Sequence, residues 1–409
     1  MATDPPETGG NGSEKQRRRD WKSNCLLIAA SVFVALVAVE IILRVTGFSS
    51  PSFYEPDPIC GYRLRPGVEG RWQKEGNAYV KINRAGFRDD EFTLTESPST
   101  YRIAVLGDSF AEALQVDLEE AFHSVMEREL EASPVLTGKN VEVFNFGVSG
   151  FGTAQEFILL QETVSQYSPD LVLLALVTEN DIRNNSKSLN QDEMIPYFVY
   201  RDGELVLDNS FLSSKRYRSR RSLPARIAYS AINYSRLLQL LYHVKSTISL
   251  YQWNQQVHEE AAEAGFEAGL DEVVYLEPVD VEWEEAWRIT EALIAKMDDE
   301  VSAMGAEFLI VTLSAGIQVH PDPAIRDSFM ENLGVSDLYY PDHRIEDFCN
   351  KNSIPALNLA PLLHEYAQEN GVYLHGFGDG VGDGHWNESG HEQAGKLISR
   401  AIEAGFFGD

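Results

Sequence analysis

The sequence predicts an α/β fold in which a parallel sheet of about five strands carries helices on both faces. The first observation is a set of short apolar runs of strand length, which end at Leu106 or cover residues 141–146, 171–177, 308–313 and 354–357. The second is that helical patterns lie between most of these runs, including Ala154–Gln166 and Trp283–Met304. Alternating strands and helices are typical of a parallel sheet in a layered domain.

A third observation is that polar and glycine residues follow the strands directly, at the sheet edge where such folds collect their functional groups. These segments are Gly107-Asp108-Ser109, Gly147-Val148-Ser149-Gly150, Thr178-Glu179-Asn180-Asp181 and Ser314-Ala315-Gly316. Ser109 is the only hydroxyl side chain in the first segment, where a buried strand breaks at glycine before a helix. We therefore predict that Ser109 is the reactive residue.

The length and charge of the chain limit its possible functions. Its 409 residues can form one large domain with insertions, or two domains. A formal net charge of −29 argues against nucleic-acid binding, because phosphate groups require a basic face, and indicates a self-repelling surface. The three cysteines have neither metal-ligand nor redox spacing, and we predict no metal and no cofactor.

The N-terminal region predicts a membrane anchor. Residues 1–23 begin without any periodic pattern and end in a basic cluster, so we expect a disordered cytoplasmic tail. Residues 24–44 are almost continuously apolar, interrupted by Glu40, and are long enough to cross a bilayer. The basic cluster places the following domain outside the cell membrane, in a periplasmic or extracellular location. A cleaved signal peptide is the alternative, although no clear small-residue cleavage site follows.

Residues 45–98 predict a small segment of strands and turns that packs on the main domain, residues 99–409. Short alternating pieces such as Tyr79–Asn83 support this interpretation. The compact turn Arg84–Asp89 carries two arginines. For this turn we favour a surface location with local salt bridges over an arginine that faces the site.

An insertion of about residues 186–282 is longer than one strand crossover requires, and predicts a helical lid or cap. It contains a basic run at 215–221, an apolar helical pattern at 227–250 and an acidic one at 258–272. Polar and charged residues interrupt the apolar pattern, so we do not expect a second membrane span. The basic run could bind acidic glycans or lipid headgroups, but a solvated loop is the simpler interpretation.

Asp383 and His385 lie two residues apart after a glycine-rich loop, Gly376–Gly384. At this spacing a carboxylate can hold an imidazole in one tautomer, and a serine, a histidine and an aspartate can serve as nucleophile, base and orienting acid. Asp379 is the fallback for the acid.

Four blocks of the sequence, in order, resemble those of the SGNH/GDSL hydrolases. The blocks are Gly107-Asp108-Ser109-Phe110, Asn145-Phe146-Gly147-Val148-Ser149-Gly150, Glu179-Asn180-Asp181 and Asp383-Gly384-His385. The resemblance implies a three-layer α/β/α, flavodoxin-like fold. It also implies catalysis by Ser109, His385 and Asp383, with an oxyanion hole formed by Ser109, Gly150 and Asn180. The anchor and the Gly-Phe-Arg-Asp segment are similar to a membrane-anchored bacterial branch.

Two departures bear on the activity that this resemblance implies. The family usually has two residues between the last aspartate and histidine, whereas here there is one, as in polysaccharide O-acetyltransferase relatives. Thr178 also stands where the family usually has glycine. We expect a serine esterase that removes an acyl or O-acetyl group from a cell-envelope carbohydrate or lipid. The alternatives are transfer of an acetyl group to a polysaccharide, and a catalytically silent glycan-binding protein.

Overall fold

A computed structural model describes residues 11–94, 99–249, 272–278 and 280–406 of the chain. Its centre is a five-stranded sheet in the order β11–β10–β7–β5–β6, and all neighbouring strands are parallel. The strands are β5 (Thr100–Gly107), β6 (Asn140–Asn145), β7 (Leu171–Leu176), β10 (Glu307–Thr312) and β11 (Ala356–Asn358). In chain order this is the 2-1-3-4-5 arrangement of flavodoxin-like folds. The predicted parallel sheet is confirmed, with strand ends within about two residues of those expected.

Helices cover both faces of the sheet, because successive residues of each buried strand point to opposite sides. Leu173 packs with one layer and Leu174 with the other. The first layer holds α3 (Phe122–Glu131), α13 (Leu359–Asn370) and α14 (Glu388–Phe406). The second holds α4 (Thr153–Glu162), α5 (Thr178–Asn185), α10 (Val281–Met304) and α12 (Tyr340–Asn352). The three-layer α/β/α prediction is therefore confirmed.

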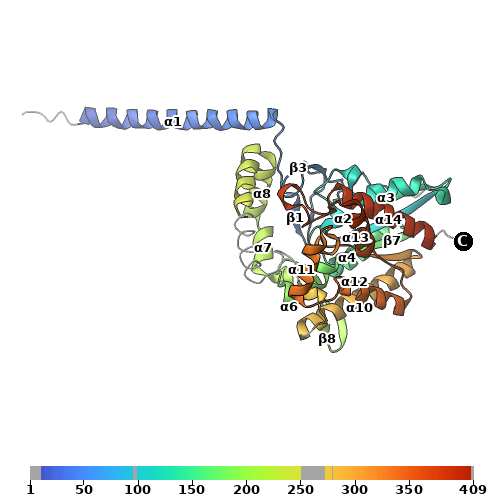
Figure 1. Ribbon diagram of the computed structural model, residues 1–409. Coiled ribbons are helices and arrows are strands. Elements are labelled where there is room, and N and C mark those ends of the chain that lie inside the picture. The colour runs from blue at the N-terminus through green and yellow to red at the C-terminus, as the bar shows by residue number, and fades with distance from the viewer. Residues whose placement is uncertain (1–10, 95–98, 250–271, 279, 407–409) are drawn as a thin grey trace, which may run out of the picture.

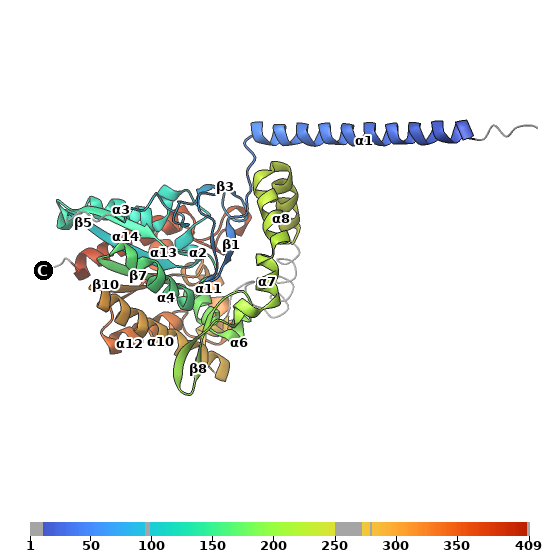
Figure 2. The ribbon, with the colours of Figure 1, turned by 180° about the vertical axis from the view of Figure 1, so that it is seen from behind.

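The N-terminal region begins with the long helix α1 (Asn11–Val45), which extends away from the domain (Figures 1 and 2). Its segment Arg17–Val45 is long and apolar enough to cross a membrane, and the most apolar 18-residue stretch within it has a mean hydropathy of 2.8. The tail expected to be disordered overlaps this helix, since residues 11–23 are helical and residues 1–10 lie outside the described part. Glu, Lys, Gln and Arg favour helix, and they extend it beyond the apolar stretch.

Two antiparallel hairpins follow α1, and both pack on the main domain. The first pairs β1 (Tyr54–Asp57) with β2 (Gly61–Leu64), and the second pairs β3 (Glu69–Trp72) with β4 (Ala78–Lys81). Phe53, Leu64, Val80 and Ile82 form a small core of this region together with Leu114 of the main domain. This shared core holds the hairpins beside the end of β5.

The insertion contains both helices and a β-hairpin that the sequence did not predict. In order, it has α6 (Lys187–Asn190), β8 (Tyr197–Arg201), β9 (Glu204–Asp208), α7 (Lys215–Arg221), α8 (Leu223–Tyr234) and a helix over residues 236–249. The expected apolar helix is thus two helices, separated at Ser235. The acidic pattern at 258–272 lies almost wholly outside the described residues. After β10 the chain forms α11 (Pro323–Leu333).

Candidate active site

Ser109 is placed by the abrupt end of β5. It is the first residue of the short helix α2 (Ser109–Glu112), and Asp108 caps this helix by accepting a hydrogen bond from the N–H of Phe110 at 2.9 Å. Gly107 allows the turn, because a Cβ there would come within 2.8 Å of the Cβ of Ala111. The half-buried Ser109 hydroxyl is thereby presented at the carboxyl edge of the sheet.

His385 lies against this hydroxyl, with its Nε2 2.8 Å from Ser109 Oγ. Its other ring nitrogen, Nδ1, lies 2.5 Å from Oε2 of Glu75. The second oxygen of Glu75 accepts the backbone N–H of His385 at 2.8 Å. Three residues from separate parts of the chain therefore form a continuous line of serine, imidazole and carboxylate.

The contact between His385 and Glu75 shifts the pKa of both groups. Burial alone lowers the pKa of His385, but the hydrogen bond and negative charge of Glu75 outweigh it, and the pKa rises above its usual value. Burial raises the pKa of Glu75, but the hydrogen bond and charge of His385 hold it below the usual range. Both shifts favour a charged Glu75 beside an imidazole that accepts a proton easily.

Asp383, the sequence-predicted orienting acid, does not occupy that position. Its Oδ1 accepts the N–H of the adjacent Gly384 at 2.6 Å, and both oxygens of Glu75 already bond to His385. Gly384 makes this possible, because it has φ +79° and a Cβ there would lie 2.5 Å from Glu75 Oε1. The fallback, Asp379, is exposed in a turn. The carboxylate at His385 Nδ1 thus comes from the N-terminal region, which the sequence did not indicate.

The loop of β3 and β4 carries Glu75 into the site. Gly76 follows it with φ +69°, and a Cβ there would meet the carbonyl oxygen of Gln115 at 2.1 Å. The hairpin tip therefore rests directly on backbone of the loop after α2. Glu75 lies far along the sequence from the segments that follow the sheet strands, and a charged residue in a hairpin turn has no distinguishing pattern, so nothing in the sequence pointed to it.

The two further predicted oxyanion donors follow the neighbouring strands, with Gly150 in the loop after β6 and Asn180 in the first turn of α5. Gly150 has φ +75°, and a Cβ there would come within 2.7 Å of the Tyr62 hydroxyl, which donates to the carbonyl of Ser149 at 2.9 Å. Asn180 donates one N–H of its amide to Asp108 Oδ2 at 2.9 Å. Since an amide nitrogen carries two N–H groups, the second stays available at the sheet edge.

Asp108 and Asp181 each bind a backbone N–H beside the site. Asp108 is fully buried, and burial raises its pKa although Asn180 and backbone N–H groups donate to it. Asp181 accepts the N–H of Val177 at 2.8 Å. Burial and the nearby carboxyl of Glu156 raise the pKa of Asp181 well above its usual range, which favours its neutral form.

Arg88 and Glu112 are both buried beneath the site, and the charge of each shifts the pKa of the other. Arg88 donates to the carbonyl of Ala113 at 2.5 Å and to that of Val116, so it holds the loop after α2. The favoured interpretation of a surface turn is wrong for Arg88, which is 1% exposed. The interpretation of a surface turn with local salt bridges is correct for Arg84, whose side chain is 91% exposed and pairs with Glu91 at 4.0 Å.

Glu112 links the hairpins to the loop that carries Gly150. It accepts the Tyr54 hydroxyl at 2.8 Å and the N–H of Ser149 at 3.1 Å, and it also bonds the Ser149 hydroxyl. Burial raises the pKa of Glu112, while these donors and the charge of Arg88 lower it, and the net result is a pKa raised to about 7. Ser149 is therefore engaged by a carboxyl group and does not meet the imidazole of His385.

His375 supports the loop of His385 from below. Its Nδ1 lies 2.7 Å from the carbonyl oxygen of Gly384, and its Nε2 lies 3.0 Å from Ser314 Oγ. Ser314 also accepts the indole N–H of Trp386 at 2.9 Å. Burial lowers the pKa of His375 to about 4, so it stays neutral and acts as a fixed hydrogen-bonding group.

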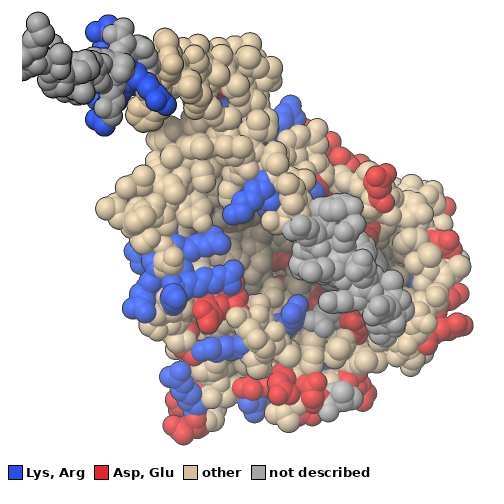
Figure 3. All heavy atoms as spheres, turned by 90° about the vertical axis from the view of Figure 1, so that its left-hand side faces the viewer, with Lys and Arg blue, Asp and Glu red and all other residues tan. Residues whose placement is uncertain are grey.

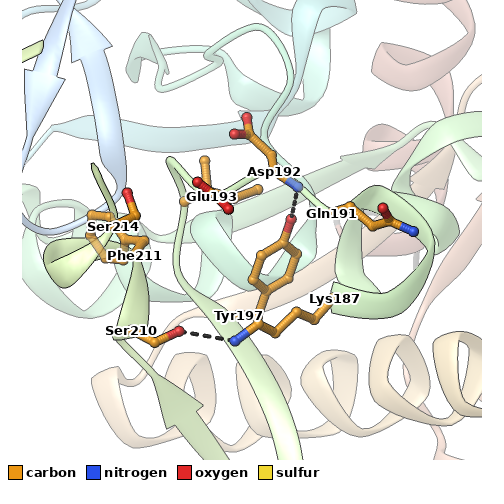
Figure 4. Close-up of a pocket in the computed structure, with 9 residues that line it drawn as sticks. Lys187, Gln191, Asp192, Glu193, Tyr197, Ser210, Phe211 and Ser214 are labelled. Carbon is orange, nitrogen blue, oxygen red and sulfur yellow. Dashed lines mark hydrogen bonds between the residues drawn. The ribbon is translucent and has the colours of Figure 1, made fainter. Parts of the chain in front are cut away.

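A separate pocket of about 350 Å³ lies in the insertion (Figure 4). Its lining comes from α6 and the segment after it, from β8 and from the segment between β9 and α7: Lys187, Gln191, Asp192, Glu193, Ile195, Tyr197, Ser210, Phe211 and Ser214. Tyr197 stands across it, and its hydroxyl oxygen accepts the N–H of Asp192 at 3.0 Å. None of the lining residues belongs to the line of Ser109, His385 and Glu75.

Comparisons with known proteins give distant structural neighbours. No family model matches the chain, and no curated protein matches it either. Among solved structures, an acetyl xylan esterase shares 12% identity over 74% of this chain and 99% of its own, with a TM-score of 0.35. A GDSL-like lipase from Bacteroides thetaiotaomicron shares 14% identity over 76% and 92%, with a TM-score of 0.32. A catalytic mutant of an acetylxylan esterase from Geobacillus stearothermophilus shares 11% identity over 76% and 95%, with a TM-score of 0.35. Likeness at this level does not decide the activity of the chain.

Proposed function

We propose that this protein is a membrane-anchored serine esterase of the SGNH/GDSL type, which hydrolyses an acyl or O-acetyl ester of a cell-envelope carbohydrate or lipid. The single observation that carries the proposal is the line from Ser109 Oγ through His385 to Glu75, with contacts of 2.8 and 2.5 Å. Such a line is what an activated serine nucleophile requires.

In this mechanism Ser109 Oγ attacks the ester carbonyl while His385 Nε2 takes its proton. Glu75 holds the imidazole through Nδ1 and stabilises the imidazolium that forms. The alcohol then leaves with a proton from His385, and water attacks the acyl-enzyme by the same route in reverse. Asp383 has a structural role in this proposal, as a cap on the turn at Gly384.

The developing oxyanion would be met by the backbone N–H of Ser109, the N–H of Gly150 and the free amide N–H of Asn180. Each follows a different strand at the same sheet edge, and Asp108 ties the segments after β5 and β7 together through Asn180. Preorganised donors of this kind usually supply the largest part of the stabilisation in acyl transfer.

The openness of the site supports a large substrate. The side chains of His385 and Glu75 are 27% and 28% exposed, so the imidazole lies near the surface and not at the bottom of a deep pocket. An acyl group on a polymer or a membrane lipid can reach such a surface site without the carrier being enclosed. The anchor α1 would keep the domain close to envelope substrates.

The test is hydrolysis of a chromogenic acetyl ester by the full chain in detergent. Ser109→Ala should lower kcat/KM by about 10⁴-fold or more, because it removes the nucleophile. Ser149→Ala is the matched control, since this serine follows the neighbouring strand but is bonded to Glu112, and it should keep most of the activity. A fluorophosphonate should label Ser109.

Equal hydrolysis by the parent and Ser109→Ala proteins would refute the esterase. If turnover instead requires an added sugar acceptor and yields an acylated sugar, transfer replaces hydrolysis as the function of the same acyl-enzyme. The short Asp383–His385 spacing is the observation that keeps this second activity under test.

A further inference from the structure

The insertion presents a pair of helices that expose many of their large apolar side chains. We call α8 and the helix over residues 236–249 the outer hairpin. It contacts the rest of the protein through polar side chains: Gln239, fully buried, accepts the N–H of Ser50 at 3.0 Å, and Asn233 accepts that of Ser52 at 3.1 Å. The side that carries Asn233 and Gln239 therefore faces the protein.

The apolar side of the outer hairpin faces outward. Leu223, Ile227 and Tyr234 of α8 are 68%, 60% and 79% exposed, and Leu241 and Ile248 of the second helix are 58% and 53% exposed. These spacings of four and seven residues place each set along one side of its helix. In the described structure α8 has no buried residue. A helix of a soluble domain normally buries its apolar side, so this one requires an apolar environment outside the protein.

The outer hairpin is bound to the end of α1. Glu40, the charge within the apolar stretch, accepts the N–H groups of Arg236 and Leu237 at 3.0 and 2.9 Å, so it caps the second helix of the hairpin. Arg44 donates to the carbonyl of Tyr234 at 2.6 Å. The helix α8 lies across the direction of α1, beside its C-terminal end, and α7 lies beyond α8 on the same side of the domain (Figures 1 and 2).

The helix α7 adds positive charge to the same side of the molecule. Five of its seven residues are basic and exposed: Lys215, Arg216, Arg218, Arg220 and Arg221. Seen from the side to which α1 extends, Lys and Arg side chains gather on one part of this face and Asp and Glu follow the opposite edge (Figure 3). In a chain with a net charge of −29, such a concentration selects a negatively charged partner.

We infer that α7 and the outer hairpin together form a membrane-binding surface beside the anchor, which we call the seat. The apolar side of the outer hairpin enters the boundary between headgroups and acyl chains, and α7 binds anionic lipid headgroups. A helix with an apolar side and a basic flank is suited to this location. A bilayer is favoured over a protein partner because Glu40 and Arg44 fix the hairpin at the end of the proposed anchor. The inference depends on α1 crossing the bilayer, but not on the proposed ester chemistry.

The seat orients the catalytic domain as well as attaching it. A single helix leaves a domain free to tilt, whereas a second, lateral contact fixes which face meets the membrane. The hairpins that carry Glu75 follow α1 directly, and Ser49, Ser50 and Ser52 contact the outer hairpin just before them. The seat would thereby hold the site at a set height above the lipid surface.

The experiment measures the depth of single positions in the full chain, reconstituted in vesicles. Ile227→Cys and Leu241→Cys, made with Cys25→Ser because Cys25 is the exposed native thiol, are labelled with an environment-sensitive fluorophore and quenched with doxyl-labelled lipid. Val135→Cys is the control. Val135 is 47% exposed and follows α3, which lies on the side of the domain away from α1 (Figure 1).

Quenching should be several-fold stronger at positions 227 and 241 than at position 135. Equal, weak quenching at all three positions would overturn the seat, and a protein partner for the outer hairpin would give that result. Replacing Lys215, Arg218 and Arg220 by Gln should weaken quenching at position 227 when phosphatidylglycerol is present, with each charge affecting partitioning by about fivefold.

Quenching that is the same in neutral and anionic vesicles would overturn the headgroup part of the inference. Hydrolysis of a soluble acetyl ester, measured on the same labelled proteins, should not change. The two proposals can therefore fail separately, because absence of hydrolysis in every variant would refute the esterase without affecting the quenching result.

Discussion

The candidate site is shared by the carboxyl edge of the sheet and by the N-terminal hairpins, and the two regions hold their residues differently. Ser109, Gly150 and Asn180 follow strands β5, β6 and β7, whose buried side chains fix where each loop begins. Glu75 stands on a hairpin tip that is held by long-range contacts to the loop after α2. The sheet edge is thus positioned by the core of the main domain, and the hairpins by a small apolar core together with specific buried polar contacts.

This difference predicts two kinds of mutational effect. Changes at the sheet edge should lower activity with little effect on folding, because the strands remain packed. Changes in the contacts of the hairpins should affect stability together with activity, because those contacts place Glu75.

At the sheet edge, Asn180→Ala should lower kcat by about 10²–10³-fold, as expected for loss of one oxyanion donor. The free energy of unfolding should change by less than for a core residue, since Asn180 is half-buried and bonds to Asp108 alone through its amide. The check is steady-state hydrolysis of an acetyl ester together with urea denaturation. A KM effect without a kcat effect would remove Asn180 from the oxyanion hole.

Beneath the hairpins, Arg88→Met should lower the free energy of unfolding by about 2–3 kcal/mol, because buried carbonyl groups lose a charged donor. Arg84→Met lies in the same turn and is the matched control. Its exposed ion pair should contribute about 0–1 kcal/mol. Both values come from denaturant unfolding of the two variants. Similar losses for the two arginines would show that Arg88 does not join the regions.

At the junction, Tyr54→Phe should cost about 1–2 kcal/mol of stability, because its hydroxyl donates to Glu112. Burial raises the pKa of Glu112 to about 7. Glu112 is therefore ionised in the folded protein at pH 8 and protonated at pH 5, so the loss should be larger at pH 8. Tyr62→Phe, which loses a bond to a carbonyl oxygen, should cost the same at both values. Identical pH dependence for the two variants would contradict this role of Glu112.

The contrast between the regions also explains what the sequence could predict. Apolar runs with helical patterns between them specified the parallel sheet, and the residues after the runs included Ser109, Gly150 and Asn180. His385 followed from its glycine-rich loop and the resemblance to SGNH/GDSL hydrolases. All of these residues depend on local pattern, which a single sequence contains.

Glu75 and Arg88 depend instead on contacts between distant segments. Glu75 is one acidic residue among 63 Asp and Glu residues, and its selection by His385 is determined only when the hairpin packs on the sheet domain. Asp383 looked better placed because of its proximity in sequence. However, φ +79° at Gly384 turns the backbone so that Asp383 bonds the next N–H, leaving Nδ1 of His385 to Glu75.

The most direct measurement is therefore kcat/KM against pH for Glu75→Gln and Asp383→Asn, each compared with the parent enzyme. His385 acts as a base when neutral, so activity should fall as pH drops through its pKa, which Glu75 raises above the usual value. Glu75→Gln should lower kcat/KM by about 10³–10⁴-fold. It should also move the acidic limb to lower pH, because burial then lowers the pKa of His385. Asp383→Asn should leave both the rate and the limb nearly unchanged. A large loss in Asp383→Asn with near-normal activity in Glu75→Gln would contradict the assignment of the orienting carboxylate to the N-terminal hairpins.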